Sequence, residues 1–373
     1  MSCPRIEVDL GKISENTQIV ARRLNARGIG VTGVTKAVCG HPAIAQAMLE
    51  GGAVGLGDAR ISNIQKLRRA GVTCPVTLIR TPMLSQVDQV VQYCEASYNT
   101  ELVIIEALAA AAIRNDTVHG IILMVEMGDR REGILPENLA AMAQQVVHMP
   151  GVNLKGIGAN FACLGHVAPD AAQMATLGNL ANEVEARFGP YIETLSGGNS
   201  ANLPWALSEQ SAGRINDLRL GEAILLGVDP VSGKQIAEMH TNAFALIAEV
   251  IETDANPIHS PIKLVDSELA KLRVVSNSDN IKRLILAIGR QDTDVMGLSM
   301  PAGSTMIGAT SDHLVIETKQ SRPKVGSEMS FQMNYSALMH AMAAPDIETI
   351  MLHDQRSRGS RRAQNTAEHL VLV

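Results

Sequence analysis

The feature that most constrains the fold is a regular alternation of short apolar runs with longer helical stretches over residues 10–226. Runs rich in Val, Ile and Gly, as buried parallel strands are, occur at residues 29–36, 53–56, 76–79, 121–126, 154–159, 192–195 and 215–220, with a weaker run around Ser97. Helical periodicity occurs at residues 13–24, 42–49, 138–148 and 171–188. This alternation predicts an α/β fold, a parallel (β/α)8 TIM-type barrel, with a doubly wound sheet as the alternative.

The pattern changes after residue 228. Short alternating or apolar runs separated by turn residues follow at residues 244–252, 273–275, 283–288, 305–309, 314–318 and 328–332, and one helix is expected at 336–343. We therefore predict a barrel over residues 10–230 and a C-terminal all-β domain over residues 231–353. A strand within residues 1–9 fits either domain. The Arg-rich residues 354–373 have little to bury and are predicted to be a disordered tail.

Composition excludes several classes of protein. The formal net charge of −6 speaks against a nucleic-acid or anionic-membrane partner. No apolar run reaches the roughly 18–20 residues that span a bilayer, and the first residues do not resemble a signal peptide. The five Cys form no CxxC pair, which indicates reduced thiols and no metal site. We expect a cytoplasmic protein.

Lys36 closes the run VTGVTK at the end of a predicted strand. In a parallel barrel this places it at the C-terminal rim, where catalytic groups collect. Partial desolvation there lowers the pKa of the amine and makes it available to form a Schiff base. A solvated lysine at a strand end is the simpler interpretation of this feature taken alone.

Two further motifs favour the interpretation of Lys36 as a Schiff-base lysine over that of a solvated lysine. The segment SGGNSANL at residues 196–203 follows a predicted strand, and its glycines would let the backbone approach a ligand. Ser200 and the neighbouring backbone N–H groups could hold a phosphate. In RLGEAILLG, Arg219 falls at the end of the following strand, whereas Arg214 precedes that strand and is expected to be exposed.

In their order these motifs resemble the alanine racemase family, and most closely its alanine/ornithine racemase group. The resemblance runs from about residue 5 to residue 352 and is carried by TKAVCGHP, GLGDARISNI, MVEMGDRREGI, GIGANFACLG, SGGNSANL, RLGEAILLG, LAIGRQD, GATSDHLVIE and NYSALMHAM. It implies an alanine racemase-like fold, pyridoxal 5'-phosphate (PLP) as cofactor, and racemisation of a free amino acid such as ornithine, lysine or alanine. It also implies a homodimer with active sites at the interface.

The resemblance assigns cofactor roles residue by residue. Lys36 matches the Schiff-base lysine, which is also one of the two bases. Arg219 matches the arginine that faces the pyridine nitrogen and, because a guanidinium does not give up its proton, keeps that nitrogen unprotonated. Ser200, the backbone of Gly221 and Tyr335 match phosphate-binding positions, although Tyr335 could instead be an ordinary amphipathic anchor.

The resemblance also assigns substrate positions. Arg131 matches the arginine near the cofactor hydroxyl and the substrate carboxylate, although it could simply be solvated or paired with the neighbouring glutamate. Asn160 stands where alanine racemases have a histidine facing the cofactor ring. Asp312 matches a position near the active-site entrance that the partner subunit contributes. For His41 and His166 we expect structural or surface roles.

The sequence departs from the family at the second base. Racemisation needs an acid on the other face of Cα, which in alanine racemases is a tyrosine near the start of the β domain of the partner. This chain has no tyrosine between residues 192 and 334, since its four tyrosines are Tyr93, Tyr98, Tyr191 and Tyr335. His259, Lys263 or Asp266 could substitute, Lys36 could serve both faces, or racemase activity could be lost. Cys39 stands about where a phosphate-contacting tyrosine is expected.

Other functions remain open on the same fold. One is a PLP-dependent decarboxylase or a dehydratase/aldolase, although the Cys–Asp pair of a decarboxylase site is absent at Ser311 and Asp312. Another is a PLP carrier without turnover. Carriers resemble this chain around Lys36 but lack a C-terminal β domain.

Overall fold

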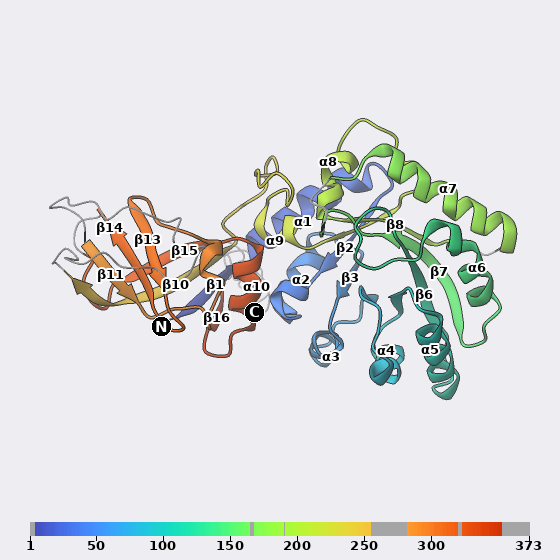
Figure 1. Cartoon of the computed structure of the whole chain (residues 1–373), viewed down its shortest axis with the longest axis horizontal. Coiled ribbons are helices and arrows are strands. Elements are labelled where there is room, and N and C mark those ends of the chain that lie inside the picture. Colours follow the sequence, from blue (N-terminus) through green and yellow to red (C-terminus); the bar gives the residue numbers. More distant parts are fainter. Residues whose placement is uncertain (1–3, 165–167, 190, 255–281, 320–322, 353–373) are drawn as a thin grey trace, which may run out of the picture. The chain divides into compact units, whose positions relative to one another are not determined.

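The structure is a computed structural model that describes residues 4–164, 168–189, 191–254, 282–319 and 323–352 (Figure 1). The chain divides into two compact units, Lys12–Thr241 on the one hand and Met1–Gly11 with Asn242–Val373 on the other. Several predictions fall outside the described residues, namely those on His166, His259, Lys263 and Asp266 and the strand predicted at residues 273–275. The predicted tail at 354–373 lies outside them as well.

The first unit is a closed parallel barrel. Its strands follow one another in chain order, and the first pairs with the last. They are β2 (Gly30–Val34), β3 (Gly55–Asp58), β4 (Val76–Leu78), β5 (Ala96–Asn99), β6 (His119–Val125), β7 (Val152–Ala159), β8 (Thr194–Asn199) and β9 (Asp217–Leu220). The predicted barrel is therefore confirmed, and the doubly wound alternative is wrong.

Helices alternate with these strands. They are α1 (Leu10–Asn25), α2 (Pro42–Glu50), α3 (Ile61–Arg69), α4 (Val87–Tyr93), α5 (Leu102–Arg114), α6 (Pro136–Val147), α7 (Ala171–Phe188), α8 (Leu203–Ala206) and α9 (Glu222–Leu226). Local chemistry sets their ends. Asp170 and Gln173 form a reciprocal capping box at the start of α7, and Gly189 ends it in the left-handed region with φ of 76°. No helix of the described residues is long and apolar enough to cross a membrane.

Small residues leave room inside the barrel for large polar ones. Tyr98 and Arg219 are both buried there. A Cβ atom on Gly158 would lie 2.9 Å from the Tyr98 ring and 3.4 Å from a terminal nitrogen of Arg219. Glycine at this position of β7 therefore makes space for the phenol and the guanidinium.

Among the strand ends that differ from the prediction, two lie beside predicted site residues. β2 ends at Val34, and Lys36 begins a 3-10 turn, η1 (Lys36–Val38). β8 continues to Asn199, so the first half of the segment 196–203, which was predicted to follow the strand, is part of the strand. Residue 197 within this strand is a glycine, and a Cβ there would lie 2.7 Å from the Ile215 side chain.

The second unit is built from antiparallel strands and one parallel pair. Its elements are β1 (Arg5–Asp9), β10 (Phe244–Asp254), β11 (Lys282–Leu286), β12 (Leu298–Ser299), β13 (Ser304–Ala309), β14 (Leu314–Thr318), β15 (Glu328–Met333), α10 (Tyr335–Ala343) and β16 (Glu348–Leu352). β1 pairs with β10 antiparallel and with β16 parallel, so the opening strand belongs to this unit. The prediction of a C-terminal β fold is confirmed. β12 and β16 were missed, the first because two residues carry no periodicity.

Candidate active site

Lys36 is held at the mouth of the barrel by the residue before it. Thr35 donates its hydroxyl to Asp58 Oδ2 at 2.7 Å. The other oxygen of Asp58 accepts from the backbone N–H of Arg60 at 2.9 Å and from Asn63 Nδ2 at 3.0 Å. Because Asp58 is fully buried at the end of β3, these bonds fix the start of the turn that carries Lys36.

The electrostatic surroundings of Lys36 favour a neutral amine. Its side chain reaches solvent, yet so much protein lies around it that burial lowers its pKa. Arg131 and Arg219 lower the pKa further, whereas Cys163 and Asp58 raise it. The net shift is downward, which increases the fraction of nucleophilic amine at neutral pH.

Arg219 on β9 projects into the barrel, and protein groups accept four of its five N–H bonds. Nη1 donates to Tyr98 Oη at 3.0 Å and to Ser196 Oγ at 2.5 Å. Nη2 donates to the carbonyl of Ala159 at 2.8 Å and to Asn160 Oδ1 at 2.7 Å. The guanidinium also lies 4.5 Å from the centre of the Tyr98 ring. Within the described part of the chain, the Nε–H is the donor left for a ligand.

A carboxylate balances this buried charge from inside the barrel. Asp217 accepts from the hydroxyl of Ser196 at 2.5 Å and from that of Thr32 at 2.6 Å. Since Ser196 also accepts from Arg219, one hydroxyl links the carboxylate to the guanidinium. A cavity of about 260 Å³ reaches Asp217 and Arg219, and Thr77 also lines it. Pairing through a hydrogen bond lowers the cost of burying both charges.

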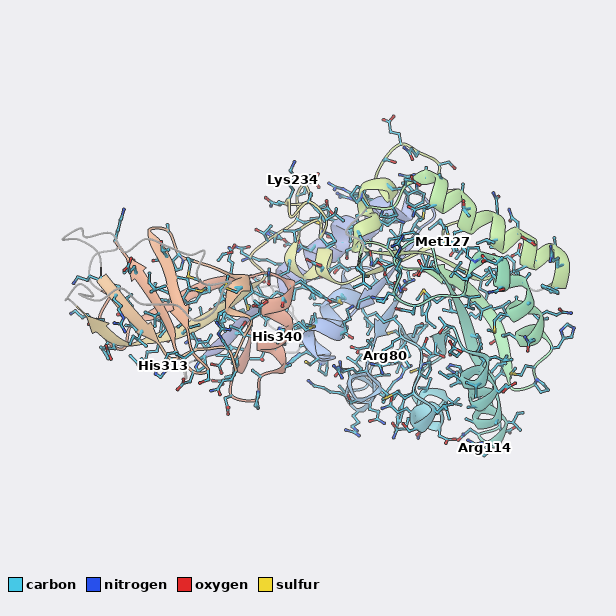
Figure 2. The ribbon with its side chains drawn as sticks, viewed as in Figure 1. Arg80, Arg114, Met127, Lys234, His313 and His340 are labelled. Carbon is cyan, nitrogen blue, oxygen red and sulfur yellow. The ribbon has the colours of Figure 1, made fainter. Side chains whose placement is uncertain are left out.

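Arg131 lies in a loop that folds back on the end of β6. Backbone bonds join Ile134 to Met124 and Glu126, at 2.8 and 2.9 Å. The Glu126 carboxylate accepts from the backbone of residues 128 and 130. Gln173 at the start of α7 donates to the carbonyl of Met127, which Figure 2 labels just beyond β6. The loop is therefore tied to the barrel along its length.

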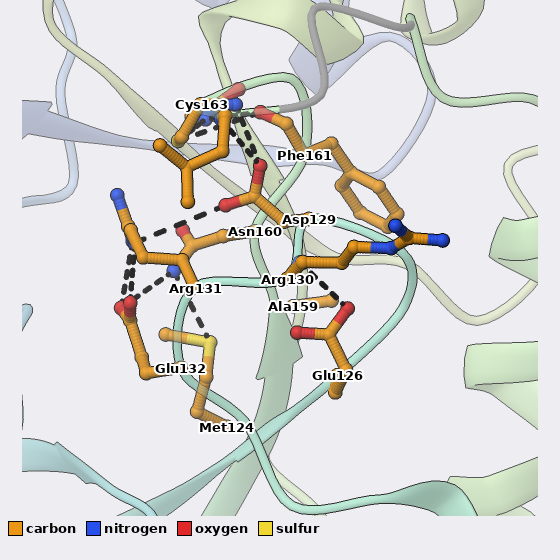
Figure 3. A network of polar contacts seen from close by, with 12 residues as sticks. Met124, Glu126, Asp129, Arg130, Arg131, Glu132, Ala159, Asn160, Phe161 and Cys163 are labelled. Carbon is orange, nitrogen blue, oxygen red and sulfur yellow. Dashed lines mark hydrogen bonds and ion pairs between the residues drawn. The ribbon is translucent and has the colours of Figure 1, made fainter.

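The two neighbouring arginines of this loop point in opposite directions (Figure 3). Arg131 forms a two-bond ion pair with Glu132, through Nη2 at 2.7 Å and through Nε. Burial lowers the pKa of Arg131, but the hydrogen bond to Glu132 and the nearby acidic groups outweigh it, so its pKa is raised. The pairing with the neighbouring glutamate is thus present, and it holds Arg131 in place.

Cys163 belongs to the same surroundings, and sequence reasoning did not single it out. Its backbone N–H, like that of Leu164, donates to Asp129 Oδ1, at 2.7 and 3.1 Å respectively. Asn199 Nδ2 lies 3.3 Å from its sulfur. Burial raises the pKa of the thiol. The only sequence feature that could have pointed to Cys163 was its place in the motif GIGANFACLG.

The loops after β8 and β9 bring Ser200 and Gly221 together. Ser200 begins the turn η3 (Ser200–Asn202) and accepts from the backbone N–H of Ala223 at 3.3 Å. Gly221 immediately precedes α9, and a Cβ there would lie 3.2 Å from Val34. A side chain at this position would crowd Val34, so the glycine lets this loop approach β2 closely.

Six of the eight predicted site residues follow barrel strands or lie on one, in the first unit. They are Lys36, Arg131, Asn160, Ser200, Arg219 and Gly221. Tyr335 begins α10, and Asp312 lies between β13 and β14, both in the second unit. Hydrogen bonds from Ser311 and Thr310 lower the pKa of Asp312. The functional roles of all eight residues stay predictions.

The barrel has the sequence of a known family. The family model described as alanine racemase, N-terminal domain, matches residues 8–230. The chain belongs to the alanine racemase family. This confirms the resemblance that the order of motifs indicated.

Two relatives match this family member over nearly its whole length. Ornithine racemase of Acetoanaerobium sticklandii is 32% identical over 355 residues, covering 94% of this chain and 99% of the relative. Lysine racemase of Thermotoga maritima is 33% identical over 356 residues, with the same coverage. This member of the alanine racemase family is accordingly an amino-acid racemase, as predicted.

Solved structures of racemases share the fold. Alanine racemase from E. faecalis superposes with a TM-score of 0.72 at 20% identity, covering 94% of this chain and 98% of the other. Histidine racemase from Leuconostoc mesenteroides gives 0.71 at 16% identity, covering 94% and 98%. At these identities the likeness establishes the fold of this alanine racemase family member and nothing finer.

Proposed function

We propose that this racemase uses PLP and that Lys36 both holds the cofactor and moves the Cα proton of a free amino acid. The observation that carries the proposal is the pairing of two features at one barrel mouth. Burial lowers the pKa of Lys36, and Arg219 keeps its Nε–H free among the described residues. A nucleophilic amine suits Schiff-base formation with PLP, and an arginine is one of the partners that PLP enzymes place at the pyridine nitrogen.

The residues present fit the cofactor. Arg219 would donate its Nε–H to the pyridine nitrogen, and the guanidinium cannot pass on a proton to it. The Ser200 hydroxyl and the backbone at Gly221 would bind the phosphate, together with Tyr335. Asn160 would face the ring. When bound, PLP supplies an electron sink for the charge left on Cα after its proton departs.

Arg131 and Lys36 would act on the substrate. Glu132 takes Nε and one Nη2 hydrogen of Arg131, so Nη1 would bind the α-carboxylate and orient Cα. Lys36, whose pKa is lowered by burial, would accept the Cα proton in its neutral form and return it in its protonated form. Because two relatives that match nearly the whole chain are ornithine and lysine racemases, we propose ornithine, lysine, alanine or a similar amino acid as substrate.

Several groups are candidates for the acid on the second face of Cα. Tyr98 is enclosed in the barrel against Arg219, which removes it as a donor to substrate. His259, Lys263 and Asp266, which lie outside the described residues, stay candidates, as does Lys36 acting on both faces. In this family the second acid comes from the partner subunit. We therefore also propose a cytoplasmic homodimer, with Asp312 near the entrance of the partner's site.

The deciding experiment follows Cα chemistry directly. Purified protein with added PLP is incubated with a panel of L-amino acids in deuterium oxide, with exchange read by NMR and D-product by chiral chromatography. We expect exchange together with D-product for at least one amino acid. Exchange without D-product would mean that Lys36 works without a competent acid opposite. Release of carbon dioxide or ammonia would replace the proposal by a decarboxylase or a dehydratase, and no exchange at all would favour a carrier.

A further inference from the structure

Hydrogen bonds link the carboxylate of Glu132 to Arg131 directly and to Arg219 through Asn160. Its Oε1 accepts from Arg131 Nη2 at 2.7 Å and from Asn160 Nδ2 at 3.1 Å. The carbonyl oxygen of Asn160 in turn accepts from Arg219 Nη2 at 2.7 Å. Figure 3 shows Glu132 and Asn160 joined in this way beside Arg131. One unbroken chain of hydrogen bonds therefore runs from Arg131 to Arg219.

The orientation of Asn160 makes this chain directional. Its carbonyl faces a guanidinium, which only donates, and its amide nitrogen faces a carboxylate, which only accepts. A flipped amide would set donor against donor at Arg219 and acceptor against acceptor at Glu132. Met124 Sδ gives the amide nitrogen a second contact at 3.5 Å. The amide can thus satisfy both ends in one orientation, and that orientation requires the charge of Glu132.

Glu132 also decides which edge of Arg131 is available. It occupies Nε and one Nη2 hydrogen in a two-bond ion pair, and the nearest other carboxylate oxygen, on Asp129, is 3.9 Å from Nε. A guanidinium clamped along one edge presents its other nitrogen in a fixed direction. Motion of Arg131 on binding a carboxylate would therefore pull on Glu132, and through Glu132 on Asn160.

We propose that Glu132 is a positioning residue that couples the substrate-carboxylate arginine to the cofactor arginine. The inference rests on the proposed function, which assigns those roles to Arg131 and Arg219. Glu132 need touch neither ligand. When a carboxylate binds Arg131, Glu132 and Asn160 transmit the resulting shift to the Nε–H of Arg219, the donor that faces the pyridine nitrogen. A change at Asn160 alters the position of Arg131 in the same way.

The test uses Glu132→Gln with Glu126→Gln as its matched control. Glu126 lies in the same loop, but its bonds go to backbone N–H groups and to neither Arg131 nor Arg219. Each variant is loaded with PLP, and acetate serves as a simple carboxylate probe whose Kd is read from the change in cofactor absorbance. The pH dependence of that absorbance, kcat and KM are measured on the same samples.

For Glu132→Gln we expect KM and the acetate Kd to rise about tenfold, the loss expected for one hydrogen bond to a charged group. We also expect a shifted pH dependence of the absorbance. Glu126→Gln should change none of these values by more than about twofold. Asn160→Ala, which leaves the bonds between Glu132 and Arg131 in place, should raise the acetate Kd as well.

Three outcomes would overturn the coupling role of Glu132. Glu132→Gln behaving like Glu126→Gln would overturn the inference, and so would a raised KM with an unchanged absorbance profile, because Glu132 would then serve Arg131 alone. If Glu132→Gln does not fold, Glu132→Asp keeps the charge but is one methylene shorter. Bound acetate should then change the cofactor absorbance less than in the wild type, and an unreduced change would refute the proposal. A wild-type enzyme that binds PLP but racemises nothing would sink the proposed function instead.

Discussion

At the scale of single residues, the site depends on groups whose chemistry is set by their neighbours. Burial lowers the pKa of Lys36, and the adjacent cations lower it further. Arg219 has its charge balanced through Ser196 and has four of its N–H bonds committed to protein. The lowered pKa favours the neutral, nucleophilic form of the Lys36 amine. The four hydrogen bonds hold the Arg219 guanidinium in place.

Replacing Lys36 by Ala should abolish both cofactor attachment and turnover. We expect the visible absorbance of lysine-linked PLP to disappear and racemisation to fall by at least about 10³-fold, the scale of a lost acid–base group. Lys155→Ala, at a lysine that pairs with Glu193 at 3.6 Å, is the control. A retained visible band in the Lys36 variant would move the assignment to another lysine.

Replacing Arg219 by Glu should redirect the chemistry. A carboxyl group facing the pyridine nitrogen can share a proton with it, so the ring would withdraw electrons more strongly and transamination should increase relative to racemisation. The ratio of pyridoxamine phosphate to D-amino acid measures this. Arg214→Ala, at an arginine that pairs with Glu185, should leave the ratio unchanged. An unchanged ratio in Arg219→Glu would show that Arg219 does not face the ring.

At the scale of strands and helices, the barrel is built to accommodate its polar interior. Tyr98 and Arg219 fit beside β7 because residue 158 is a glycine. Ser97 on β5 and His119 on β6 form a second buried pair, with 2.8 Å between Oγ and Nε2. In both cases a residue on another strand of the barrel provides what the buried polar side chain needs, space at Gly158 and a hydrogen bond between Ser97 and His119.

Gly158→Ala should disturb the strand interior and the site together. The added methyl would meet Tyr98 and Arg219, and overpacking of this kind costs about 1–3 kcal/mol. We expect a lower free energy of unfolding in urea and weaker PLP binding. Gly178→Ala in α7 is the matched control, because its nearest contact is an ordinary 3.9 Å. Normal PLP affinity in Gly158→Ala would mean that Arg219 tolerates displacement.

His119 should make the stability of the β5–β6 pair depend on pH. Burial lowers its pKa from 6.5 to about 4, so the unfolded chain binds a proton first as pH falls. Stability should therefore decline between about pH 6.5 and pH 4, by roughly 3 kcal/mol if the shift is fully expressed. Urea unfolding of the wild type and of His119→Gln measures this. If the free energy of unfolding fell equally with pH in the two proteins, His119 would be excluded as the source of the pH dependence.

The sequence predicted the elements better than it predicted their connections. Lys36, Arg219 and the barrel strands followed from apolar runs and from motif order, because buried parallel strands have a distinctive composition. The end of β8 was misplaced, since Gly197 and Gly198 look like a loop and are in fact strand residues. Glu132 and Cys163 were not among the predicted site residues, because the bonds of Glu132 to Asn160 and of Cys163 to Asp129 join loops that are distant in sequence and carry no periodic signal.

At the scale of the whole molecule, the proposed homodimer is open to direct test. If each site needs a second-face acid and Asp312 from the partner, a separated subunit should be inactive. Sedimentation velocity across a dilution series, with racemase assays on the same samples, measures this. We expect specific activity to fall as the dimer dissociates. A fully active monomer would contradict the assembly and would require both acids to lie within one chain.

The pairing of β1 has a consequence for how the protein is made. Arg5 contacts Glu328, 323 positions later, and β1 lies beside β16. The residues of the barrel emerge from the ribosome between those partners, so the barrel can fold during synthesis while β1 waits for β10, β15 and β16. The β unit is thus the last part to assemble. Its first strand therefore lacks its pairing partners until these later strands have been synthesised.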